Sequence, residues 1–141
     1  MTPTHIMLHC TATPEGREVT AKDVDLWHKQ RGFRCIGYHY LIKLDGTVEK
    51  GRADNEVGAH CNKQKMNYKA LGVCYAGGLA KDGKTPKDTR TPEQRAALVK
   101  LVKELMKKYN IPLNRVVCHN QYDNKACPSF SIDTFRREYS F

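Results

Sequence analysis

The chain has 141 residues, of which 40% are hydrophobic and 28% are charged. This balance is typical of one folded domain, and it excludes a disordered tail, a collagen-like repeat and a multidomain assembly. No run of about 18 apolar residues is present, so we expect no insertion into a membrane. Lys and Arg number 24 and Asp and Glu 15, and the resulting net charge of +9 favours a polyanionic partner.

Short segments of alternating or apolar character predict β-strands. They are residues 6–11, 38–44, 47–50, 70–76 and 115–119. Asp45-Gly46, between the second and third of these strands, is a strong signal for a tight turn and therefore for a hairpin. Polar residues dominate 51–69 and 81–90, which predicts a long loop and a solvated turn region.

Three segments predict helices. Thr20 begins the first as its cap, with Asp23 three residues later as in a capping box. Thr91 and Gln94 form the same pattern before a stretch with apolar residues at helical spacing. Residues 132–139 predict a short closing helix. Strands mixed with helices imply an α/β or α+β fold with a mixed sheet.

Two histidines lie beside a cysteine on predicted strands, as His9-Cys10 and Cys118-His119. Successive strand side chains point to opposite faces, so two histidines on one face leave both cysteines on the other as small core residues. Cys127 follows in a loop with room to turn back toward the last strand. Two imidazoles and one thiolate suit Zn²⁺, and three protein ligands leave the fourth position open, as catalytic zinc sites require.

Other interpretations of the same residues remain open. Cys127 and His119 are also the pair that a cysteine hydrolase would use, although that leaves His9 without a role. The net charge alone would allow a nucleic-acid binder, but we find no helix-turn-helix, zinc finger or stacking motif and expect no specific nucleic-acid partner. The six cysteines form no C-x-x-C pair, and we favour a reduced protein.

Several stretches, in chain order, resemble the zinc-dependent N-acetylmuramoyl-L-alanine amidases, a family that includes small phage enzymes and the peptidoglycan recognition proteins of animals. The matching stretches are residues 8–13, 37–40 with 45–49, 71–74, and 119–130. The resemblance implies a single amidase domain over residues 1–141, with a central mixed sheet flanked by helices and a zinc cleft on one side. It also implies hydrolysis of the amide bond between N-acetylmuramic acid and L-alanine in peptidoglycan.

By resemblance, His9, His119 and Cys127 match the three zinc ligands of the family, in agreement with the strand-face argument. A non-catalytic peptidoglycan-binding module of the same fold is the alternative within the family. Animal members that have lost activity have also lost the zinc cysteine, whereas Cys127 is retained here. We therefore expect an enzyme with one Zn²⁺ per chain.

Tyr38 matches a tyrosine and Lys125 a lysine that the phage enzymes need for catalysis. A lysine near the ligands would place a cation beside the oxyanion that develops during amide hydrolysis. A phenol with an ordinary pKa of about 10 is better suited to orienting water than to removing a proton.

His39 and His60 match positions near the cleft, and we expect them to contact substrate. By alternation Tyr38 shares a face with Tyr40, Ile42 and Leu44, and we expect His5 and His28 to be structural.

Residues 1–5 lead directly into a strand and do not resemble a secretory signal peptide. We therefore expect a cytoplasmic protein at synthesis that acts on the cell wall after release, as phage and prophage endolysins do. Its positive charge would help to hold it on an anionic wall. A phage member of the family also binds an RNA polymerase, but we do not expect this property here because the chain begins almost at its first strand.

Overall fold

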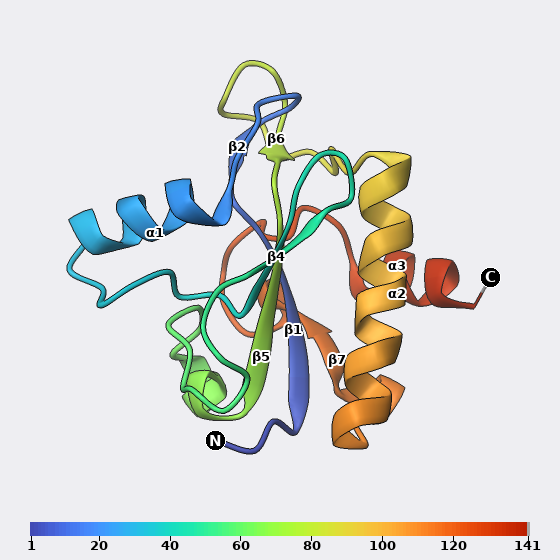
Figure 1. The fold of residues 1–141 in the computed structure, drawn as a ribbon. Helices are drawn as coiled ribbons and strands as arrows, with labels where there is room; N and C mark the ends of the chain where they lie inside the picture. Colours follow the sequence, from blue (N-terminus) through green and yellow to red (C-terminus); the bar gives the residue numbers. More distant parts are fainter. Residues whose placement is uncertain (141) are drawn as a thin grey trace.

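The computed structural model describes residues 1–140, which are built around a five-stranded mixed sheet (Figure 1). The strand order is β4-β3-β5-β1-β7. Strands β3, β5, β1 and β7 run parallel to one another, and β4 pairs antiparallel with β3 at one edge. The strands of this sheet are β1 (His5–Cys10), β3 (Tyr40–Ile42), β4 (Val48–Lys50), β5 (Ala70–Tyr75) and β7 (Val116–Cys118). A two-stranded sheet pairs β2 (Thr13–Pro14) with β6 (Gly78–Leu79).

Helices cover both faces of the large sheet. Figure 1 shows α1 (Ala21–Gln30) on one side and α2 (Pro92–Tyr109) with α3 (Ile132–Tyr139) on the other. Three short 3₁₀ segments complete the description: η1 (Lys63–Tyr68), η2 (Leu113–Arg115) and η3 (His119–Gln121). Among residues 1–140, no helix combines the length and apolar character needed to cross a membrane. The predicted α/β fold with a central mixed sheet flanked by helices is confirmed.

Both predicted capping boxes are present. The Thr20 hydroxyl accepts the Asp23 N–H at 3.2 Å, and the Asp23 carboxylate accepts the Thr20 N–H at 3.0 Å. Thr91 and Gln94 exchange the same bonds at 3.0 and 2.9 Å. Each box satisfies N–H groups that the first turn of a helix leaves free. The buried Gln94 amide also donates to two strand-end carbonyls and so ties the start of α2 to the sheet.

The predicted hairpin is formed by β3 and β4, which are shorter than expected. Gly46 has φ +88°, a conformation that glycine adopts without strain, and the Lys43 N–H donates to the Thr47 carbonyl at 2.9 Å across the turn. Register pairs Leu41 with Glu49. β3 begins only at Tyr40 because the chain bends just before it.

The two faces of the sheet bury different sets of side chains. The larger apolar cluster lies between the sheet and the helices α2 and α3, and it contains Cys10 and Cys118. The opposite face is covered by α1 over Leu41 and Cys74 and by η1 over Met7. Cys10 and Cys118 therefore behave as small core residues, as the strand-face argument predicted.

Two polar stretches have more structure than predicted. Residues 51–69 contain η1 rather than a loop throughout. In the stretch 81–90, Arg90 is buried rather than solvated, and its guanidinium pairs with Asp88 at 2.9 Å and with Glu138 of α3 at 2.8 Å. Composition did not predict this burial, because one of the two carboxylates that pair with Arg90 belongs to Glu138, 48 residues away in the sequence.

Candidate active site

Three side chains from distant parts of the chain meet at one end of the sheet. His9 is near the end of β1, and His119 follows β7, whose Cys118 is paired in register with Leu8 of β1. The ring centroids of His9 and His119 are 4.6 Å apart. Cys127 returns from the following loop and places its Sγ 3.6 Å from His9 Nδ1. One ligand atom from each of the three lies within 4.8 Å of the others, close enough to share a metal ion.

The hydrogen bonding of this cluster fits a metal ligand set. His119 Nδ1 is buried and has no hydrogen-bond partner within the described part of the chain. A buried polar atom without a partner costs free energy, so this nitrogen is a candidate to bind a metal ion. The backbone N–H of Cys10 donates to Cys127 Sγ at 3.2 Å, a contact that favours a sulfur carrying negative charge. Two neutral imidazoles and a thiolate are a donor set that Zn²⁺ accepts.

Burial sets the protonation of the two imidazoles. It lowers the pKa of His9 well below the usual value, and the neighbouring His60 and His119 add to the effect. The pKa of His119 is also lowered, first by burial and then by the positive charge of Lys125. Both rings are therefore neutral at pH 7, the form in which histidine binds a metal.

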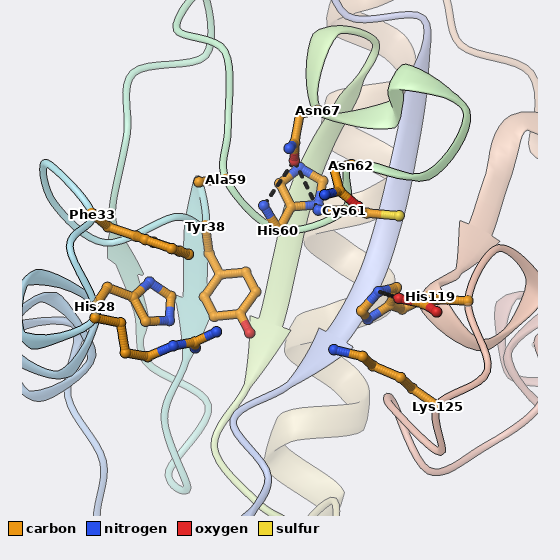
Figure 2. A pocket seen from close by; sticks show the side chains of 12 residues that line it. His28, Phe33, Tyr38, Ala59, His60, Cys61, Asn62, Asn67, His119 and Lys125 are labelled. Atoms are coloured by element: carbon orange, nitrogen blue, oxygen red, sulfur yellow. Dashed lines mark hydrogen bonds and ion pairs between the residues drawn. The ribbon is translucent and has the colours of Figure 1, made fainter.

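A pocket of about 360 Å³ opens beside the cluster (Figure 2). Figure 2 shows Tyr38 and Lys125 on opposite sides, with the hydroxyl and the ammonium group directed into the space between them. A second pocket of about 250 Å³ shares Tyr38, His119 and Lys125 with the first and is also lined by Cys127. The open space therefore runs from the first pocket to the proposed ligand cysteine.

Tyr38 faces the site and not the core beneath α2. Its ring centroid lies 5.1 Å from that of His9. The Tyr38 side chain packs with the apolar residues beneath α1, whereas Tyr40 and Ile42 pack on the α2 side of the sheet. The predicted shared face of Tyr38 and Tyr40 is therefore wrong, because β3 begins only at Tyr40 and strand alternation does not extend to Tyr38. Burial raises the pKa of Tyr38 well above its usual value, so the phenol keeps its proton.

His39 is not placed to contact substrate. Its side chain is 0% exposed, its Nδ1 accepts the Gly72 N–H at 3.0 Å, and its Nε2 bonds the Glu56 carbonyl at 2.8 Å. Both ring nitrogens hold backbone together, so the predicted substrate contact is corrected to a structural role.

His60 lines the pocket, but its two ring nitrogens are also occupied. Nδ1 lies 2.8 Å from His9 Nε2, and Nε2 lies 3.1 Å from the Ala70 carbonyl oxygen. Burial lowers the pKa of His60 to about 3, so its ring is neutral. His60 therefore has no free nitrogen for a substrate, and its polar contact is with a ligand histidine.

His28, which the sequence predicted to be structural, holds backbone in place and also borders the site. His28 lines both pockets, and its Nδ1 accepts the Gly37 N–H at 2.8 Å, so the proton of the neutral ring is on Nε2. Figure 2 shows the ring beside Tyr38, and the two ring centroids are 5.4 Å apart. No periodicity could have revealed this position, because His28 lies on the same helical face as the buried Val24.

Comparison with known proteins places this site in a family. The sequence model of the N-acetylmuramoyl-L-alanine amidases matches residues 1–130. The chain belongs to this family. Its relatives include the endolysin of Escherichia phage T7, to which the amidase is 39% identical over 127 residues, spanning 90% of this chain and 81% of that protein.

Solved structures agree with this membership. The N-acetylmuramoyl-L-alanine amidase LysC from Clostridium intestinale matches with a TM-score of 0.80 at 31% identity, covering 99% of this chain and 87% of that one. Wild-type Drosophila PGRP-LB matches with a TM-score of 0.76 at 25% identity, covering all of this chain and 82% of that one. The amidase thus shares its whole fold with both a bacterial amidase and an animal peptidoglycan recognition protein.

In this amidase the residues expected at the centre of the site lie together. His9, His119 and Cys127 form a cluster that could hold a metal ion, and Tyr38 and Lys125 flank the pocket beside it. All six cysteines, each within the described residues, are free thiols, as favoured from their spacing.

Proposed function

We propose that this amidase uses a zinc ion held by His9 Nδ1, His119 Nδ1 and Cys127 Sγ to cleave the bond between N-acetylmuramic acid and L-alanine. Its activity is the peptidoglycan amidase activity of its family, and residues 1–141 are proposed to act as one domain. The observation that carries the metal assignment is the buried His119 Nδ1, which has no partner among the described residues although its side chain belongs to the cluster with His9 and Cys127.

The chemistry of amide hydrolysis explains why a metal is needed at this position. Zinc, when bound, lowers the pKa of a water molecule toward about 7 and polarises a carbonyl group. His9, His119 and Cys127 would supply three ligands, and His119 and Cys127 also line a pocket that a substrate could enter, as expected of a catalytic rather than a structural zinc site.

Tyr38 and Lys125 act on the substrate from the two sides of the pocket. The Lys125 ammonium is proposed to stabilise the negative charge that develops on the amide oxygen. The buried Tyr38 phenol keeps its proton and is proposed to donate a hydrogen bond that orients the reacting groups. Tyr38 packs beneath α1, and Lys125 lies two residues before Cys127 in the same loop.

A cysteine hydrolase built on Cys127 and His119 is less consistent with the site. A nucleophilic cysteine pairs with one imidazole that acts as its base, whereas Cys127 Sγ lies 3.6 Å from His9 Nδ1 in a cluster that also contains His119. That alternative also leaves the buried His9 unexplained.

Similarity to phage endolysins supports a further proposal about where the amidase acts. We propose that it is made in the cytoplasm and reaches the peptidoglycan only after the membrane is breached. When the protein is expressed alone, cells should remain intact until the membrane is permeabilised. Lysis without permeabilisation would contradict this location.

Metal analysis combined with a peptidoglycan digest tests the zinc assignment. The purified wild type should contain about one zinc per chain, a chelator should stop release of stem peptides, and zinc should restore it. Cys127→Ser should lose zinc and activity together. Zinc at 100 times its Kd should also raise the free energy of unfolding of the wild type by about 2.7 kcal/mol. Full activity of metal-free protein would overturn the assignment.

A further inference from the structure

His60 joins a ligand histidine to the backbone of the sheet. Its Nε2 lies 3.1 Å from the carbonyl oxygen of Ala70, and its Nδ1 lies 2.8 Å from His9 Nε2. On the far side of the His9 ring, Nδ1 lies 3.6 Å from Cys127 Sγ. One continuous line of contacts therefore runs from the start of β5 through two imidazoles to the ligand cluster.

The order of donors and acceptors along this line is fixed by its first member. A carbonyl oxygen can only accept, so the Ala70 contact requires a proton on His60 Nε2. Since a neutral imidazole carries one proton, His60 Nδ1 is an acceptor. It therefore takes the hydrogen bond from His9 Nε2–H, and the lone pair of His9 is left on Nδ1, the nitrogen nearest Cys127.

Two glycines make room for the His60 ring. A Cβ atom at Gly72 would lie 2.7 Å from His60 Cδ2, and one at Gly58 would lie 2.6 Å from the same atom. Real side chains almost never approach so closely, so any other residue at these positions would displace the ring. The ring orientation is therefore built into the backbone.

The backbone that carries His60 is held as well. The Asn67 side-chain oxygen accepts the N–H groups of His60 at 2.8 Å and of Cys61 at 2.7 Å, as the dashed lines in Figure 2 mark. Asn67 belongs to η1, within the stretch 51–69 whose composition predicted a loop. This part of the chain thus supports the site although it contributes no ligand.

We propose that His60 is a positioning residue that fixes the tautomer and ring orientation of His9, so that His9 Nδ1 presents its lone pair to the metal. The proposal rests on the proposed function for the metal. The second ligand histidine has only a looser equivalent: His119 Nε2 lies 3.8 Å from the Asp123 carboxylate, which is beyond hydrogen-bond length. His9 is therefore the ligand whose geometry depends most on a partner.

Zinc affinity and histidine ¹⁵N spectra test this role together. In the wild type, ¹⁵N spectra of the metal-free chain should show His9 protonated at Nε2 and unprotonated at Nδ1. His60→Phe fills the space beside the glycines but cannot accept a hydrogen bond, and it should weaken zinc binding by about 10- to 100-fold in competition with a chelator. His60→Asn retains an oxygen near the position of Nδ1 and should recover part of this loss.

His5→Phe is the matched control, because it makes the same change of residue type at the start of β1, the strand that carries His9, and away from the site. Its zinc affinity should equal that of the wild type. The positioning role is wrong if metal-free wild type carries the His9 proton on Nδ1, or if His60→Phe and His60→Asn bind zinc as tightly as the wild type. Absence of zinc binding by the wild type would instead refute the proposed function, so the two failures are distinguishable.

Discussion

Lys125 and the ligand Cys127 lie two residues apart, yet they differ in environment. Cys127 is half-buried and accepts a backbone hydrogen bond, whereas the Lys125 side chain is exposed and directed into the pocket. Under the proposed function, loss of Cys127 should abolish metal binding, whereas loss of Lys125 should leave the cluster of His9, His119 and Cys127 intact. The two residues can therefore be separated experimentally.

Lys125→Met should lower kcat by about 100-fold, because it removes one positive charge beside the developing oxyanion. Zinc content and thermal stability should stay at wild-type values. Lys100→Met, on the exposed side of α2, is the matched control and should retain full activity. The assigned role would be refuted by a Lys125→Met enzyme that retains wild-type kcat, or by one that has lost its zinc.

At the scale of elements, one carboxylate ties three segments together. Asp54, in the loop after β4, accepts the Tyr40 hydroxyl of β3 at 2.6 Å, the Tyr109 hydroxyl at the end of α2, and the ammonium group of Lys50. Burial alone would raise the pKa of Asp54, but these hydrogen bonds outweigh it and hold the pKa well below its usual range. The carboxylate thus fastens the segment leading to His60 against the hairpin and α2.

Asp54→Asn should lower the free energy of unfolding by about 2 kcal/mol at pH 7, since charge-assisted hydrogen bonds are lost from a side chain only 13% exposed. A depressed folded-state pKa stabilises the fold above the unfolded pKa of about 3.9 and ceases to do so as the pH falls through the folded value. The difference between wild type and variant should therefore shrink below pH of about 4. Urea denaturation across this range measures it, with the exposed Asp133→Asn as control. A difference that is independent of pH would contradict this explanation.

At the scale of the whole molecule, the net charge of +9 is the property that bears on peptidoglycan. The exposed lysines of α2 lie on the face of the sheet opposite the pocket, so charge is not confined to the site. Attraction between this surface and an anionic wall would act at long range and would be screened by salt, with a Debye length of about 10 Å at 0.1 M.

Co-sedimentation with purified sacculi should show this dependence. Binding of metal-free protein should fall several-fold as NaCl rises from about 50 to 300 mM. The double variant Lys103→Gln with Lys107→Gln should bind more weakly at low salt, and the matching pair of Lys→Arg changes should not. Binding that is insensitive to ionic strength would refute an electrostatic contribution.

The sequence alone determined the features that depend on neighbours along the chain. Both capping boxes, the Asp45-Gly46 turn and the closing helix follow from local hydrogen bonding and periodicity, and strand alternation put Cys10 and Cys118 in the core. The resemblance to amidases then identified the five residues at the centre of the site. Neither the local sequence patterns nor the resemblance revealed the hydrogen bonds that support those five residues.

Only the tertiary structure decided which histidine does what. The resemblance gave His39 and His60 the same expected role as substrate contacts. In the structure, His39 is fully buried and His60 contacts His9, while His28 lines the pocket. Arg90 is buried because Glu138 reaches it across 48 residues. The physical reason is common to all of these cases: a hydrogen bond or ion pair between distant segments depends on where the fold brings them, and no local pattern encodes that meeting.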